Sequence, residues 1–144
     1  MSKAIETVIG FDYGNKKIGI ATGQTLTKSA NALKTIASPK ASRNWNPITE
    51  IINEWQPDAL IVGVPVHMDG TEIELTKEAR RFAQSLQGRY NKPVFLVDER
   101  LSSVEAAQEI ASERAAGIRK KTVKGDIDKL AASIILQTWF NQKS

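Results

Sequence analysis

The sequence predicts an α/β domain in which helices cover both faces of one mixed β-sheet. Short apolar, β-branched runs alternate with segments whose apolar residues recur at helical spacing. The first three runs are separated by short polar turns, so these strands are expected to be antiparallel. The last two runs are separated by helical segments, which makes them parallel to the first strand. We therefore expect five strands, three antiparallel and then two parallel.

The composition limits the kinds of chemistry that the chain can perform. With 144 residues, 41% of them hydrophobic, it is expected to form a single domain over residues 1–144. No apolar run reaches the roughly 18 residues of a membrane span, and MSKAIET lacks the apolar core of a signal peptide, so a cytoplasmic location without membrane contact is expected. There is no cysteine and one histidine, His67. Metal chemistry would rest on oxygen ligands, which favours Mg²⁺ or Mn²⁺.

The first element is a predicted β-hairpin. The apolar run Val8–Phe11 ends on Asp12, residues 14–16 form a Gly-Asn-Lys turn, and a second apolar run follows at Ile18–Thr22. Asp12 is unusual because its strand is too apolar for a surface edge. A carboxylate there must be paired or bind a cation. The alternative, that Asp12 caps the turn through its own backbone, stays open on this stretch alone.

A third strand is expected at Ser29–Ile36, followed by a polar, turn-rich segment at Ala37–Asn46. Asn46 is the predicted N-cap of the first helix, with Pro47 in its first turn. This helix is expected to end at residues 56–58. Its apolar stripe consists of Ile48, Ile51, Ile52 and Trp55.

The run Ala59–Val64 is typical of a buried parallel strand. A second helix is expected after a loop in which His67 and Asp69 are ordinary loop residues. Thr71 and Glu74 form a possible capping box, although the helix can begin a few residues later. Gly88 is the expected stop. The predicted buried face is Leu75, Ala79, Phe82, Ala83 and Leu86.

The fifth strand is predicted at Val94–Val97, running into Asp98 and Glu99. Ser102 and Glu105 form a further capping box, which is expected to open an alanine-rich helix to about Arg114. A last helix begins near Asp126. Its predicted buried residues are Ile127, Leu130, Ala131, Ile134, Ile135, Leu136, Thr138, Trp139 and Phe140.

The positive charge is concentrated in residues 114–124. The net charge is +4, yet without the five basic residues of this segment 15 basic residues face 16 acidic ones. Gly117 within the segment and Gly125 directly after it suggest a mobile loop that contacts the phosphate backbone of a nucleic acid. A solvated loop without a partner is the alternative. Lys16 and Lys17, beside the hairpin turn, can likewise contact phosphates or simply be solvated. The five residues are Arg114, Arg119, Lys120, Lys121 and Lys124.

The carboxylates are the candidate catalytic groups. Asp12 and the Asp98–Glu99 pair end parallel strands, so they should share one edge of the sheet, where ligand sites of such folds lie. Asp128 is on the flank of the last helix's apolar stripe, in its first turn. Converging acids would suit two-metal phosphoryl transfer. Alternatively, Asp98 pairs with Arg100, and Asp128 serves the helix dipole, as Asp126 can.

Four motifs in order resemble the YqgF (RuvX) family: FDYGNKKIGIATG, DALIVGVPVHMDGTE, VDERLSSVEAAQ and GDIDKLAASIIL. The resemblance spans residues 5–140, with Ser103 where the family commonly has Thr. It implies a ribonuclease H-like fold and similarity to RuvC resolvases. Family members are candidate nucleases for the 5′ end of pre-16S ribosomal RNA. By these motifs Asp12, Glu99 and Asp128 would be the catalytic and metal-binding acids, which selects Glu99 over Asp98 and Asp128 over Asp126.

The leading hypothesis is thus a nuclease that acts on structured RNA, with two Mg²⁺ or Mn²⁺ ions bound together with the substrate. The first alternative is a Holliday junction DNA endonuclease, which would need a homodimer to cut two strands. An actin-like kinase would need a second lobe, for which the chain is too short. A non-catalytic RNA-binding module is disfavoured because all three acids are present. The expected role of Trp45, Trp55 and Trp139 is packing rather than base stacking.

Overall fold

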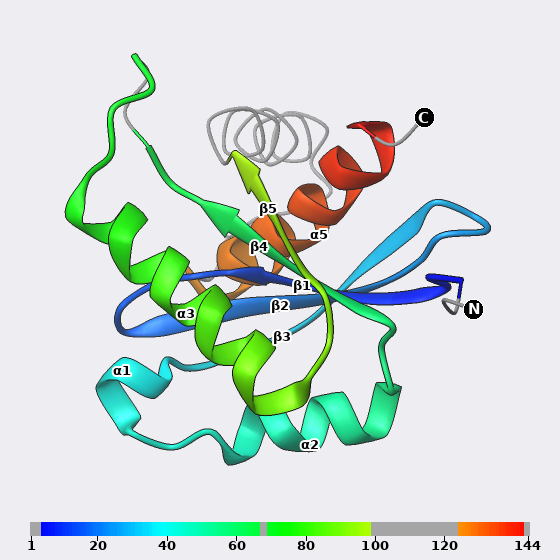
Figure 1. Ribbon diagram of the computed structural model, residues 1–144, viewed down its shortest axis with the longest axis horizontal. Coiled ribbons are helices and arrows are strands. Elements are labelled where there is room, and N and C mark those ends of the chain that lie inside the picture. The colour runs from blue at the N-terminus through cyan, green and yellow to red at the C-terminus, as the bar shows by residue number, and fades with distance from the viewer. Residues whose placement is uncertain (1–3, 67–68, 99–123, 143–144) are drawn as a thin grey trace.

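The computed structural model describes residues 4–66, 69–98 and 124–142 (Figure 1). In chain order the elements are β1 (Thr7–Asp12), β2 (Lys17–Gln24), β3 (Ser29–Ala37), α1 (Pro39–Ser42), α2 (Asn46–Trp55), β4 (Ala59–Val64), α3 (Glu74–Tyr90), β5 (Val94–Asp98) and α5 (Lys124–Gln142).

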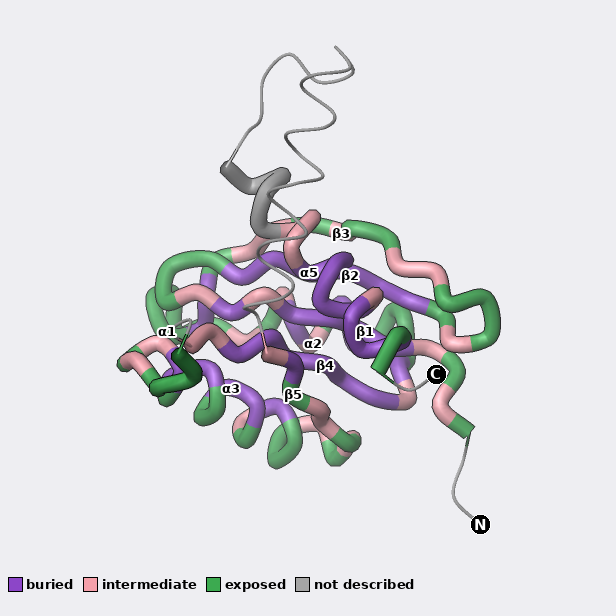
Figure 2. Tube along the Cα trace, turned by 90° about the horizontal axis from the view of Figure 1, so that it is seen from above, coloured by how far each residue is buried: buried purple, intermediate pink, exposed green. Residues whose placement is uncertain are grey.

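The five strands form one mixed sheet in the order β3-β2-β1-β4-β5. β1 pairs antiparallel with β2, and β2 pairs antiparallel with β3. β4 pairs parallel with both β1 and β5. The number and directions of the strands are those predicted, and all five predicted strands are confirmed to within two residues at their ends. All six residues of β4 are buried because helices cover both faces of the central strands (Figure 2).

The sheet separates two hydrophobic cores, and α2 and α3 lie on the face opposite α5 (Figure 1). Side chains alternate along a strand, so Ile9 and Phe11 of β1 join the α2/α3 core, whereas Val8 joins the α5 core. Helices on both faces are therefore confirmed.

α5 approaches the sheet most closely over glycines. A Cβ on Gly10 would lie 2.6 Å from Leu136 Cγ and 3.2 Å from the backbone oxygen of Ala132. A Cβ on Gly23 would lie 3.0 Å from Phe140 Cζ. The missing side chains of β1 and β2 thus allow the helix to pack directly on the strands.

The start of α2 differs from the prediction by one residue. Trp45 is the N-cap, and Asn46 is already helical. The side chain of Asn44 accepts the Asn46 N–H at 3.1 Å, so an asparagine two residues earlier supplies the cap. Trp55 was expected in the buried stripe, but it is 37% exposed at the last helical position, where it extends beyond the core.

The Thr71–Glu74 capping box is wrong. The Thr71 hydroxyl donates to Asp69 at 2.7 Å, and α3 begins at Glu74 after Ile73. Its cap is made by Thr76, whose hydroxyl accepts the Ile73 N–H at 3.0 Å. The competing turn around Asp69 occupies Thr71, while Thr76 lies within reach of the true N-cap.

Gly88 is not the end of α3. The helix continues to Tyr90, and Asn91 ends it in the left-handed conformation with φ 52°. Asparagine tolerates this conformation well. Gly88 stays helical at a modest cost because its site is exposed and a Cβ there would contact nothing within 4 Å.

The segment predicted as polar turns contains the short helix α1, with Pro39 in its first turn and Arg43 as a left-handed cap. The last helix begins at Lys124, two residues before the predicted start at Asp126. Lys124 therefore belongs to α5 rather than to the basic loop. The predicted helix over residues 102–114 and the rest of the basic segment lie outside the described residues. Among the described ranges no helix is long and apolar enough to cross a membrane.

Candidate active site

Asp12 is the last residue of β1 and lies at the carboxyl end of this central strand. It pairs with Gly19 of β2 on one side and with Gly63 of β4 on the other. Directly paired residues share a face of the sheet, so neither neighbouring strand places a side chain beside the carboxylate. By alternation from Val8 and Gly10, the half-buried Asp12 faces the α5 side. The Asp12 side chain therefore lies between two glycine positions on the α5 face.

The direction of α5 determines which of its turns lies near Asp12. Phe140 packs at Gly23, which pairs with Val8 at the start of β1, whereas Ala132 packs at Gly10, two residues before Asp12. The helix therefore runs antiparallel to β1. Asp128 lies one helical turn before Ala132, so the backbone of this first turn is at the carboxyl end of β1.

Asp98 lies at the same edge of the sheet but on the other face. Asp98 is the last residue of β5 and pairs with Val64 of β4. Together with Arg80 of α3 it lines a small cavity on the α2/α3 side. Asp12 and Asp98 are thus separated by the sheet itself. Glu99, the acid selected by the motif resemblance, lies outside the described residues.

The metal-binding constellation remains a prediction. Among residues 4–66, 69–98 and 129–142, whose side chains are described, no three His, Cys, Asp or Glu side chains gather closely enough to hold a metal ion. Of the three acids that the motif resemblance selects, Asp12 is the one whose side chain lies in these ranges. Its carboxylate is an oxygen donor of the kind that Mg²⁺ and Mn²⁺ prefer, which is compatible with such an ion.

Other predicted residues are placed as follows. Lys16 and Lys17 are exposed beside the hairpin turn, and the Lys16 carbonyl accepts the Ser38 N–H at 2.8 Å. Asp69 is a turn residue as predicted, since its Oδ1 accepts from both the N–H and the hydroxyl of Thr71. Arg114, Arg119, Lys120, Lys121 and the side chain of Lys124 lie outside the description.

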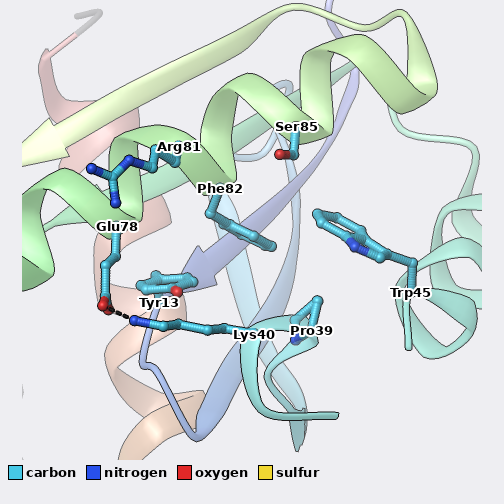
Figure 3. A pocket seen from close by; sticks show the side chains of 8 residues that line it. All are labelled: Tyr13, Pro39, Lys40, Trp45, Glu78, Arg81, Phe82 and Ser85. Atoms are coloured by element: carbon cyan, nitrogen blue, oxygen red, sulfur yellow. Dashed lines mark hydrogen bonds and ion pairs between the residues drawn. The ribbon is translucent and has the colours of Figure 1, made fainter. Parts of the chain in front are cut away.

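Sequence reasoning missed a second cluster around Tyr13, on the α2/α3 face. A cavity of about 300 Å³ lies there between α1 and α3, with Lys40 and Glu78 forming an ion pair at its side (Figure 3). Burial raises the pKa of Tyr13 above its ordinary value, and the Ser38 hydroxyl, which approaches without a well-formed hydrogen bond, offsets this in part. The available signal was Glu78, a carboxylate within the apolar stripe of α3.

A family model and the curated relatives both assign the chain to one family. The RuvX family model, described as "Holliday junction resolvase", matches residues 6–142. A relative from Glaesserella parasuis named "Putative pre-16S rRNA nuclease" is 46% identical over 139 residues, covering 96% of this chain and 99% of the relative. A protein of the same name from Haemophilus ducreyi is 47% identical over 135 residues, covering 94% and 96%.

Solved structures share the architecture at low sequence identity. RuvC from T. thermophilus in complex with a Holliday junction substrate has a TM-score of 0.62 at 16% identity and covers 96% of this chain and 95% of its own. The Fowlpox virus resolvase in complex with Holliday junction DNA has a TM-score of 0.57 at 14% identity, covering 95% and 98%. The fold is therefore the ribonuclease H-like fold of the RuvC resolvases, and the chain belongs to the RuvX family.

Proposed function

We propose that this protein is a metal-dependent nuclease that hydrolyses phosphodiester bonds of precursor 16S ribosomal RNA, near its 5′ end, in the cytoplasm. The observation that carries the proposal is the placement of Asp12. It ends the central strand between two glycines, and the first turn of α5 lies above the same edge. The names of the curated relatives support the substrate.

The proposed catalytic and metal-binding residues are Asp12, Glu99 and Asp128. Asp98 is a poor partner for Asp12 because it faces α3, on the other side of the sheet. This position of Asp98 supports the choice of Glu99 as the acid of its motif. Three carboxylates at one edge repel one another, so they favour bound cations that offset their charge.

The protein's own contribution to the reaction is placement and charge. Asp12 is paired with a strand on each side, which holds the backbone that carries its carboxylate in a fixed position. Two Mg²⁺ or Mn²⁺ ions, when bound with substrate, would activate the attacking water and stabilise the leaving oxygen. Lys16 and Lys17 at the hairpin turn, together with the basic residues of segment 114–124, are proposed to contact phosphates on either side of the cleaved bond.

Replacement of Asp12 by Asn tests this proposal. Asp12→Asn should abolish Mg²⁺-dependent cleavage of precursor ribosomal RNA, because the neutral amide is a weaker cation ligand. The matched control is Asp98→Asn at the same edge but on the opposite face, which should retain cleavage. Circular dichroism should show both variants folded. Full activity of Asp12→Asn would contradict the proposed site.

The second candidate is a Holliday junction resolvase, which the description of the family model favours. Such an enzyme must cut two strands, which would require a homodimer. Assays of the wild type on the RNA precursor and on a four-way DNA junction distinguish the candidates, with the same two variants as controls for the site. Cleavage of the junction but not of the RNA precursor would replace the first proposal by the second.

A further inference from the structure

The cavity beside Tyr13 has a chemical character of its own. It opens on the α2/α3 face, next to the carboxyl end of β1, and measures about 300 Å³, within the range of small-molecule pockets. Three aromatic and three charged side chains line most of it (Figure 3). These are Tyr13, Trp45 and Phe82, and Lys40, Glu78 and Arg81.

Glu78 is the distinctive group in this cavity. Its side chain is 9% exposed, and Lys40 forms an ion pair with its Oε1. Its Oε2 is buried and has no hydrogen-bond partner among the described residues. Such an oxygen costs free energy unless a donor reaches it, and an ionised carboxylate accepts several donors. Glu78 therefore keeps unused acceptor capacity beside the cavity, which a ligand donor can use once the side chain turns toward it.

The aromatic groups provide flat apolar walls. Phe82 packs against Tyr13 at 5.1 Å and against Trp45 at 5.6 Å between ring centroids, with the Trp45 ring nearly parallel at 18°. Arg89 lies 4.3 Å from the Trp45 ring centroid and holds the indole in place. Tyr13 and Phe82 are buried, so the packed rings form a rigid apolar wall that the edge of a planar base can contact.

We propose that this cavity binds a guanine base of the RNA, with Glu78 accepting hydrogen bonds from N1–H and the N2 amino group. Guanine places two adjacent donors on its Watson–Crick edge, which match the two oxygens of a carboxylate. Adenine, cytosine and uracil place an acceptor beside each donor on that edge, and this acceptor would repel Glu78. For both oxygens of Glu78 to accept from guanine, Lys40 must leave Oε1, and it would then join the exposed Arg81 in meeting the phosphates of the bound nucleotide.

The cavity is close to the proposed cleavage site along the chain but on the other face. Tyr13 directly follows Asp12, and successive residues face opposite sides of the sheet. An RNA strand that passes around this edge would present a base to the cavity and a phosphate a few nucleotides away to Asp12. The inference rests on the proposed function for the choice of RNA, whereas guanine binding is measured without any cleavage.

The experiment measures binding of labelled pentaribonucleotides by fluorescence anisotropy, in EDTA so that no cleavage occurs. The central nucleotide is guanosine, inosine or adenosine, and the other four are uridines. Inosine keeps N1–H and lacks the N2 amino group, so it isolates one hydrogen bond to a charged acceptor. The wild type should bind the guanosine pentamer about tenfold more tightly than the inosine pentamer. Equal binding of all three pentamers would overturn the proposal.

Two variants and one control locate the preference. Glu78→Gln should remove most of it, while Glu72→Gln, which breaks the exposed Glu72–Arg80 ion pair outside the cavity, should leave it unchanged. If Glu78→Gln does not fold, Ser85→Phe fills the cavity and leaves Lys40 and Glu78 intact. A guanosine preference that survives filling would contradict the proposal. Loss of cleavage in Asp12→Asn together with intact guanosine binding separates this inference from the proposed function.

Discussion

Gly10 and Gly88 show how differently one residue type is constrained at two places. A Cβ on Gly10 would approach Leu136 Cγ to 2.6 Å, so Gly10→Ala must displace α5 from the sheet. We expect a loss of about 1–3 kcal/mol in the free energy of unfolding. Gly88→Ala, in the exposed interior of α3 with open space around it, should instead gain about 0.5–1 kcal/mol. Urea denaturation measures both, and a stable Gly10→Ala variant would contradict the close packing of α5.

Tyr13 gives the stability a dependence on pH. Burial raises its pKa above the ordinary value of 10.0, so the unfolded chain releases this proton at a lower pH than the folded protein. The contribution is complete below pH 10.0 and is lost as pH rises through the folded-state pKa. In Tyr13→Phe the decrease in unfolding free energy between about pH 9 and pH 11 should be smaller than in the wild type. Parallel curves for the two proteins would show that Tyr13 does not contribute.

At the scale of one element, the start of α3 depends on Thr76. Its buried hydroxyl accepts the Ile73 N–H and donates to the Pro65 carbonyl, which joins the helix to the chain after β4. Thr76→Val keeps the shape but leaves both backbone groups without this partner, so we expect a loss of about 1–3 kcal/mol. The control is Thr71→Val, whose exposed hydroxyl bonds Asp69, with an expected change within about 0.5 kcal/mol. Chemical denaturation distinguishes the two, and equal effects would show that Thr76 does not hold the helix start.

At the scale of the whole molecule, the positive excess lies in one segment. Lys120→Ala combined with Lys121→Ala should weaken RNA binding across sequences, because phosphate contacts carry no base information. The slope of log binding constant against log salt concentration should become shallower by about one unit for each phosphate that the variant no longer neutralises. A titration of salt with labelled RNA measures this slope. An unchanged slope would mean that the segment is solvated in the complex.

The proposed reaction also makes a prediction about ions. Activity should require Mg²⁺ or Mn²⁺, while Ca²⁺ should bind without supporting turnover, since its ligands lie farther away, at about 2.3–2.6 Å, in looser geometry. Without RNA the protein should bind Mg²⁺ weakly, because substrate phosphates complete the coordination of the ion. Calorimetric titration with and without a non-cleavable RNA measures this difference. Equal turnover with Ca²⁺ would contradict the mechanism.

The sequence by itself determined the number and directions of the strands. Apolar periodicity and the lengths of the connections are local properties, and for a chain with short turns followed by helical crossovers they leave few topologies. The position of Asp12 at the end of a central strand follows from the same pattern. The family motifs then gave the candidate acids, which composition alone could not rank.

Tertiary structure decided what depends on contacts between distant segments. Asp12 ends β1 and Asp98 ends β5, both at the same edge of the sheet. Only the packing of the helices shows that the two side chains face opposite sides. Thr76 caps the start of α3, and its hydroxyl also donates a hydrogen bond to the Pro65 carbonyl in the chain after β4. The Glu78 cavity exists because α1, unpredicted from sequence, packs beside α3 and supplies Lys40. Such pairings form through space, and no local pattern encodes them.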